Sequence, residues 1–205
     1  MVVLKATEDN IRKAAHIVAE GGLVVYPTET VYGLGCNPFN AQAVNHILEL
    51  KRGRKKPLPI LASKIDDVEK IAYVSAKGRN LAEKFWPGQL TMVFPRKSAL
   101  LDAATFGWNS VGVRIPDNQV ASELIRLSGG LLIGTSANLT GEMAPRKVKE
   151  ISQVLKELVE VVLDGGVTAK GIPSTVVDLT SAELRILREG PISFSKILET
   201  LASST

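Results

Sequence analysis

The segment LVVYPTETVYGLG, residues 23–35, carries the pattern from which the fold of this chain is predicted. Its four apolar residues, Leu23 to Tyr26, predict a short buried strand. Directly after that strand come two threonines and two glycines, Thr28, Thr30, Gly33 and Gly35. Such residues can offer hydrogen bonds and close backbone approach to a small polar ligand. A β-turn followed by a short edge strand would explain the same residues without a ligand.

The pattern around this strand predicts alternating helices and strands. Thr7 with Glu8 and Asp9 is typical of a capped helix start, and Gly21 and Gly22 end the apolar periodicity before the strand. Further helices are expected at 41–50, from Ser63, from Ser75, and at 119–127, 148–158 and 193–201. Further strands are expected at 59–61, 90–94, 110–115, 131–135, 161–163, 174–179 and 184–188. The alternation favours an α/β fold, and adjacent strands near the C-terminus predict a mixed sheet.

Composition limits the class of protein. With 205 residues, 45% of them apolar and 22% charged, and with no repeat or change in composition, the chain is expected to form one domain over residues 1–205. Its apolar runs are too short to span a membrane, and charges scattered over the first 20 residues predict a cytoplasmic protein. A single cysteine, Cys36, and two histidines predict neither disulfides nor a zinc cluster. Any metal is expected to arrive with a ligand.

Positive charge is concentrated in one short stretch. Net charge is +4, and five cations occupy the six positions from 51 to 56: Lys51, Arg52, Arg54, Lys55 and Lys56. Arginine forks and lysine ammonium groups suit a triphosphate, and they suit RNA phosphates equally well. A solvated basic loop is the alternative. Because neither a GxxxxGK[ST] nor a GxGxxG pattern is present, any ATP is expected to bind without a P-loop.

Three later segments add polar groups at predicted strands. Ser136 and Asn138 follow the strand at 131–135, and both can face one ligand. Arg114 belongs to a predicted strand, where a buried guanidinium needs an anionic partner. That partner is either a ligand carboxylate or an internal Asp or Glu. Arg188 can bind phosphate or simply lie at a strand edge.

Together these segments resemble the YrdC-like threonylcarbamoyl-adenylate synthases. The motifs that carry the resemblance span residues 8 to 200: YPTETVYGLG, the cation cluster before Pro57, VGVRIP, TSANLTG, STVVDL and LREGP. The resemblance implies an α/β fold with a twisted mixed sheet, flanking helices and a large concave basic cavity. Because the chain ends near residue 205, it resembles the short, single-domain form of the family.

The family resemblance also implies a reaction. L-Threonine, bicarbonate and ATP, with Mg²⁺ on the phosphates, would give threonylcarbamoyl-adenylate and pyrophosphate. A separate threonylcarbamoyl transferase complex would then use the adenylate to make threonylcarbamoyladenosine in tRNA. Catalysis would come mainly from positioning, with Lys51 and Arg54 the best candidates for a direct part in it.

Motif by motif, the resemblance assigns residues to two substrates. The L-threonine site would comprise Thr28, Thr30, Arg114, Gly134 and Ser174. The ATP site would comprise Lys51, Arg52, Arg54, Lys56, Ser110, Ser136, Asn138 and Arg188. The cation cluster is one residue shorter than the family pattern, so its arginine position falls to Arg52 or Arg54. Leu61 and Ala144 stand where some members carry a histidine and a serine.

Two other functions fit the same pattern. A basic cavity of this kind could bind double-stranded RNA or tRNA without chemistry, and a related domain handles carbamoyl-adenylate in hydrogenase maturation. A threonine pocket distinguishes a synthase from a protein that only binds nucleic-acid phosphates. The side chains of Thr28, Thr30 and Arg114 have no reason to converge in a protein of the second kind. The intact Ser136-Ala137-Asn138 sequence argues against an inactive relative.

Overall fold

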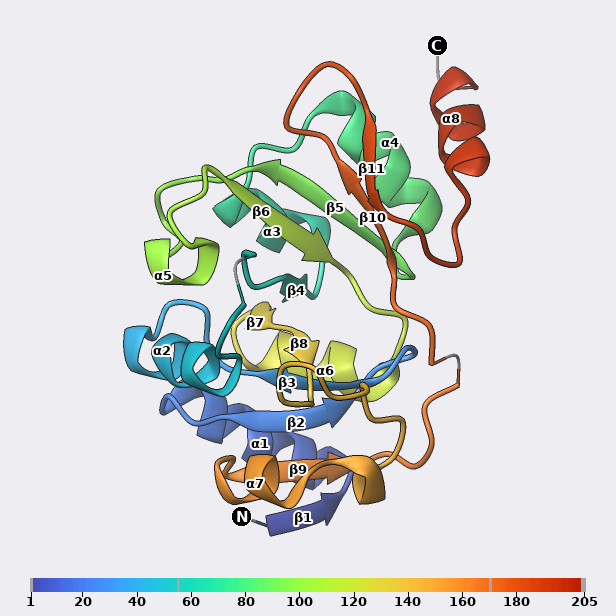
Figure 1. Cartoon of the computed structure of the whole chain (residues 1–205). Helices are drawn as coiled ribbons and strands as arrows, with labels where there is room; N and C mark the ends of the chain where they lie inside the picture. Colours follow the sequence, from blue (N-terminus) through green and yellow to red (C-terminus); the bar gives the residue numbers. More distant parts are fainter. Residues whose placement is uncertain (1, 55, 170, 204–205) are drawn as a thin grey trace.

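The computed structural model describes residues 2–54, 56–169 and 171–203, and its strands form two mixed sheets (Figure 1). The first sheet has the order β1 (Val2–Lys5), β9 (Val161–Asp164), β2 (Val24–Pro27), β3 (Tyr32–Gly35) and β8 (Thr135–Ser136). The second sheet has the order β11 (Arg185–Arg188), β10 (Thr175–Asp178), β5 (Leu90–Pro95), β6 (Ser110–Arg114), β4 (Ile60–Ala62) and β7 (Leu131–Ile133). The predicted α/β class with mixed pairing and flanking helices is confirmed, but the strands are divided between two sheets.

Eight α-helices of the described chain flank these sheets. They are α1 (Glu8–Ala19), α2 (Ala41–Leu50), α3 (Ile65–Ile71), α4 (Ala76–Phe85), α5 (Asp102–Thr105), α6 (Gln119–Leu127), α7 (Gln153–Glu157) and α8 (Phe194–Ala202). In Figure 1, α4 and α8 lie beside the second sheet, and α1 and α7 lie beside the first. None of the helices in the described ranges is long and apolar enough to cross a lipid bilayer.

The two cores form because each helix buries one apolar stripe. On α1, Ile11, Ala14 and Val18 recur at helical spacing and pack with Leu124 of α6 and Val24 of β2. A larger core combines residues of both sheets and several helices, and it includes Tyr32, Ile60, Met92 and Phe94. Buried contacts of this kind supply most of the stability of both sheets.

Two predicted elements differ from the structure. The helix expected at 148–158 is instead a 3₁₀ turn, η1 (Val148–Glu150), followed by α7. Ile151 is extended between them, and Ser152 caps α7 by accepting the amide of Leu155. A helix expected to open at Ser63 begins at Ile65, and the Ser63 amide donates instead to the Gly130 carbonyl. At Ser152 the serine side chain competes with continuous helical bonding.

The strand predicted at 131–135 is broken at Gly134. Residues before the glycine pair with β4 in the second sheet, and residues after it pair with β3 in the first. A side chain at Gly134 would collide with Leu61, so only glycine lets the backbone pass at this point. The short strands β7 and β8 therefore connect the two sheets. The strand β1 was not predicted. The alternative of a β-turn and a short edge strand after β2 was right about the strand β3 but wrong about its place, because β3 lies between β2 and β8.

Candidate functional site

One face of the second sheet carries Arg114 and Arg188. Along β6, Val111 and Val113 face the core, so the alternating positions Ser110, Gly112 and Arg114 face the other side. Leu61 pairs with Arg114, Thr91 pairs with Val176, and Val176 pairs with Arg188. Because Met92 pairs with Val113, Thr91 comes opposite Arg114 one residue further along. This row across five strands places both arginines on the same face.

Arg188 holds Ser174 on this face. Its Nε donates to the Ser174 carbonyl at 2.9 Å, and its Nη2 donates to the Ser174 hydroxyl at 3.1 Å. That hydroxyl also lies 2.7 Å from the hydroxyl of Thr91. Although part of the Arg188 side chain is exposed, the surrounding protein and the charge of Arg114 lower the pKa of Arg188. Residues predicted for two different substrates are thus in direct contact.

Arg114 forms a buried ion pair with Glu29, which joins the β2–β3 turn of the first sheet to the end of β6. Its Nη1 lies 2.7 Å from Glu29 Oε1, and the side chains are 9% and 7% exposed. The other carboxylate oxygen, Glu29 Oε2, is buried without a hydrogen-bond partner among the described residues. Of the two partners left open by the sequence, the structure places the internal carboxylate on Arg114. Binding of a threonine carboxylate by Arg114 stays a prediction.

The two threonines of the β2–β3 turn are both buried, but their hydroxyls differ. Thr28 Oγ1 donates to the Val31 carbonyl at 2.8 Å and accepts from the Thr30 and Val31 amides at 3.1 and 3.3 Å. Since its one hydrogen is used, the 2.7 Å contact between the two hydroxyls has Thr30 as donor. Thr28 therefore builds the turn, whereas Thr30 Oγ1 keeps capacity to accept a further hydrogen bond.

Lys51 is buried against the loop of residues 136–142, called here the SAN loop. Its Nζ lies 2.6 Å from the Ser136 carbonyl, 2.5 Å from the Asn138 carbonyl and 3.0 Å from Asn138 Oδ1. Three acceptors match the three N–H groups of a lysine ammonium. Burial and the nearby charge of Arg54 lower the pKa of Lys51 to about 8. For this residue, the alternative of a solvated basic loop is wrong.

Within the SAN loop, Ser136 and Asn138 are tied to each other. The Ser136 hydroxyl donates to Asn138 Oδ1 at 2.5 Å, and Asn138 Nδ2 donates to the Glu142 carbonyl at 2.6 Å. Glu142 Oε2 in turn accepts the Leu139 amide at 2.9 Å. Glu142 was not predicted as part of this cluster, although a carboxylate four residues after Asn138 was a usable signal.

The remaining cations of the 51–56 stretch take different positions. Arg54 is half-buried, its guanidinium donates to the Lys56 and Pro57 carbonyls, and burial with the charge of Arg188 lowers its pKa. Arg52 and Lys56 are exposed, and Lys55 lies outside the described residues. The charge of Arg188 thus acts on Arg54, and the charge of Arg114 acts on Arg188.

Two predicted residues lie less centrally. Ser110 shares the face of Arg114 on β6, but four residues of strand put about 13 Å between their backbones. Gly134 lies where the chain passes between the sheets and touches Leu61, the neighbour of Arg114 on β4. The structure therefore places Gly134 beside the row that carries Arg114.

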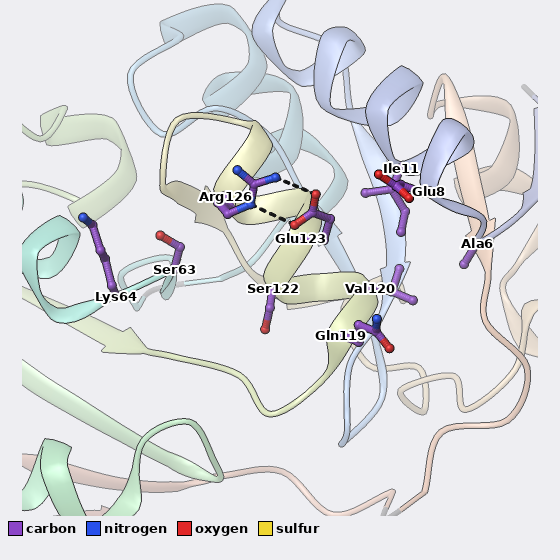
Figure 2. Close-up of a pocket in the computed structure, with 10 residues that line it drawn as sticks. All are labelled: Ala6, Glu8, Ile11, Ser63, Lys64, Gln119, Val120, Ser122, Glu123 and Arg126. Carbon is purple, nitrogen blue, oxygen red and sulfur yellow. Dashed lines mark hydrogen bonds and ion pairs between the residues drawn. The ribbon is translucent and has the colours of Figure 1, made fainter.

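A pocket of about 770 Å³ lies in another part of the molecule (Figure 2). Its lining comes largely from α1 and α6, and Figure 2 shows Arg126 joined to Glu123 by two hydrogen bonds, at 2.8 and 2.7 Å. No residue predicted for threonine or ATP lines this pocket. A large concave basic cavity stays a prediction. No group of three or more His, Cys, Asp and Glu side chains in the described ranges could hold a metal ion.

Comparisons with known proteins agree with this arrangement. A family model for the Sua5, YciO and YrdC proteins, described as telomere recombination, matches residues 16–190. The threonylcarbamoyl-AMP synthase of Pyrococcus abyssi is 38% identical over 192 residues, and that of Bacillus subtilis is 36% identical over 197. The crystal structure of P. abyssi Sua5 complexed with L-threonine has a TM-score of 0.94 and 35% identity, covering 98% of this chain and 61% of that one.

The lengths of these relatives differ from that of the chain. The matches cover 93% and 95% of this chain, which spans 56% of the P. abyssi relative and 57% of the B. subtilis relative. The family model nevertheless matches residues 16–190, which is well over half of the chain. The chain therefore belongs to the Sua5/YciO/YrdC family.

Proposed function

We propose that this protein forms threonylcarbamoyl-adenylate and pyrophosphate from L-threonine, bicarbonate and ATP. The observation that carries the proposal is the convergence of cations and hydroxyls from distant parts of the sequence. Lys51 meets Ser136 and Asn138, while Arg54, Arg188 and Arg114 influence one another in turn. Family membership and the printed names of the relatives support the same reaction.

In this proposal the amino acid lies near the β2–β3 turn and the end of β6. Arg114 takes the carboxylate, Thr30 and Ser174 offer hydroxyls, and Gly134 permits close approach of the ligand to the backbone. Thr28 shapes the turn that presents Thr30, as its four hydrogen bonds indicate. The similarity to a structure solved with L-threonine supports an amino-acid site in this fold.

ATP is proposed to lie along the cations and the SAN loop. Arg54 and Arg188 are the guanidinium groups best placed for phosphates, with Ser136 and Asn138 near the nucleotide and Ser110 further along the same sheet face. Lys51 lies beside Ser136 and Asn138. Arg52 and Lys56 are exposed and contribute long-range positive charge. The choice of Arg54 over Arg52 is supported by its partial burial and by its coupling to Arg188.

The chemistry asks little covalent work of the protein. The threonine amine forms a carbamate, either with carbon dioxide and release of a proton or with bicarbonate and release of water. A carbamate oxygen then attacks the α-phosphorus, and pyrophosphate leaves. Positioned cations lower the barrier by neutralising charge that develops on the phosphates. Mg²⁺ is proposed to enter bound to ATP. The adenylate would pass to a threonylcarbamoyl transferase complex that modifies tRNA in the cytoplasm, and the whole chain would act as one domain.

Pyrophosphate release tests the proposal. Purified protein with MgATP and bicarbonate should release pyrophosphate when L-threonine is added, and reaction mixtures without threonine or bicarbonate set the background. Adding a threonylcarbamoyl transferase complex and unmodified tRNA should then give threonylcarbamoyladenosine, detected by nucleoside mass spectrometry. If the protein binds double-stranded RNA but releases no pyrophosphate above background, the RNA-binding alternative replaces this proposal.

A further inference from the structure

Glu29 carries an unused acceptor at the proposed amino-acid site. Its side chain is only 7% exposed, one carboxylate oxygen pairs with Arg114, and the other has no partner in the described ranges. A buried charged acceptor that lacks a hydrogen bond is unfavourable, and few native proteins keep one without a reason. Glu29 also stands between Thr28 and Thr30, in the turn already assigned to the amino acid.

We propose that Glu29 accepts an N–H hydrogen bond from the amino group of the amino-acid substrate, while Arg114 binds the carboxylate of the same molecule. This inference rests on the proposed function, because it places L-threonine at the end of β6. It adds a specificity-determining residue: the site would require an α-amino group as well as an α-carboxylate.

The chemistry of an amino-acid zwitterion matches the pair. The ammonium and carboxylate groups sit on one carbon, so they need an acceptor and a donor side by side. Arg114 uses Nη1 for Glu29, and a guanidinium has five N–H donors, so further donors can serve a ligand carboxylate. Glu29 supplies the matching negative charge. Hydrogen bonds in which both partners are charged are stronger than neutral ones.

Glu29 Oε2 is buried, so the carboxylate must turn to meet an amino group. Glu29 belongs to the turn between β2 and β3 rather than to a regular strand, and the terminal torsion of a glutamate is broad. The carboxylate can therefore rotate while it stays beside Arg114. Thr30 Oγ1, which also keeps acceptor capacity, lies on the next residue. Both acceptors suit an N–H donor better than a second anion.

A purely structural role for Glu29 makes a different prediction. If Glu29 only neutralises Arg114, its loss should weaken the binding of every ligand that contacts Arg114 by the same factor. If Glu29 binds the amino group, its loss should weaken the binding only of ligands that carry an amino group. The two roles are separated by comparing L-threonine with 3-hydroxybutanoate, in which hydrogen replaces the amino group.

The first measurement uses the unmodified full chain, so it does not depend on a variant that folds. Calorimetry in the presence of MgATP should show that 3-hydroxybutanoate binds at least about tenfold more weakly than L-threonine, as expected for loss of a charged hydrogen bond. Equal affinity for the two ligands would overturn the inference. Failure of both ligands to bind, together with no pyrophosphate release, would instead overturn the proposed function.

The second measurement uses Glu29→Gln, which keeps the shape of the side chain and removes its charge. This variant should lose most of the preference for L-threonine over 3-hydroxybutanoate and keep its ATP affinity within about twofold. The matched control is Glu123→Gln, which changes an arginine-paired glutamate on α6, away from the site. It should keep the full preference. If Glu29→Gln lowers the affinity for both ligands by the same factor, Glu29 has a structural role only.

Discussion

Two buried cations of the site, Lys51 and Arg114, are held in different ways. Three oxygens of the SAN loop surround the Lys51 ammonium, so its donors are matched within the protein. Arg114 meets one oxygen of Glu29, and the second oxygen of that carboxylate has no partner in the described ranges. The donors of Lys51 are matched within the protein, whereas the Glu29–Arg114 pair leaves one carboxylate oxygen unpaired. On the function proposed above, Lys51 would shape the site and Arg114 would bind a substrate.

Breaking the Glu29–Arg114 pair should have the largest effect on stability. Glu29→Ala leaves the Arg114 charge buried without its partner and should lower the free energy of unfolding by about 3–5 kcal/mol. The double variant with Arg114→Leu should lose less than the sum of the two single variants, because neither charge is then left alone. Urea denaturation with equal m-values checks both expectations.

The exposed pair on α6 is the control for this experiment. Glu123 and Arg126 form a comparable ion pair in which the side chains are 28% and 59% exposed. Glu123→Ala should change the free energy of unfolding by no more than about 1 kcal/mol, because exposed ion pairs contribute little. A loss in Glu29→Ala no larger than in Glu123→Ala would contradict the importance assigned to the buried pair.

Lys51→Met should loosen the SAN loop. The methionine keeps a similar length but leaves the Ser136 and Asn138 oxygens without their donor. We expect faster hydrogen exchange over residues 136–142 and ATP binding weakened by at least about tenfold. Exchange mass spectrometry and calorimetry measure the two effects, with Lys64→Met, at an exposed ion pair, as the control. Weaker ATP binding with unchanged exchange would assign Lys51 to the phosphates rather than to the loop.

Arg54→Ala and Arg52→Ala should differ in ATP binding. Arg54 is half-buried near Arg188, so its loss should weaken ATP binding by about tenfold, a change of about 1.4 kcal/mol. Arg52 is exposed, and its loss should change the affinity by no more than about twofold. Titration of each variant with ATP at fixed ionic strength makes the comparison. The reverse order of effects would assign the arginine of the cluster to Arg52.

A final expected effect is a change in stability with pH. The pKa of Lys51 is lowered from 10.5 to about 8 in the folded protein, so between these values the unfolded chain binds the extra proton. Stability due to Lys51 should therefore rise with pH in this window, by at most about 1.4 kcal/mol per pH unit. Unfolding at pH 8, 9 and 10 should show the wild type gaining stability relative to Lys51→Met. A constant difference would mean that Lys51 titrates near its ordinary value.

Helices whose ends are set by residues adjacent in the sequence were predicted well. The helices expected at 41–50 and 119–127 match α2 and α6 at both ends, since Asn40 and Asn118 cap their first turns. The expectation failed at 148–158, where Ser152 begins a new helix within the apolar pattern. At β3 the alternative of a turn and an edge strand gave the strand but not its position inside the first sheet.

The site shows the same division. The sequence singled out the cations and hydroxyls by their residue types and by the family motifs, and several of them, including Lys51, Ser136, Arg114, Arg188 and Ser174, make contacts between distant segments. The partners of the two buried cations were not predictable, because 85 residues separate Lys51 from Ser136 and the same number separate Glu29 from Arg114. Glu29 itself was missed, since nothing local marks which carboxylate will meet an arginine on another sheet.

By itself, therefore, the sequence determined the α/β class, most helices and strands, and the set of polar residues available for a basic site. These follow from periodicity, capping and charge, which act over a few neighbouring residues. Only the tertiary structure decided that the strands form two sheets, that Gly134 connects them, and that Lys51 is enclosed while Glu29 keeps one oxygen unpaired. Those features depend on strand register and burial between distant segments, which local patterns do not specify.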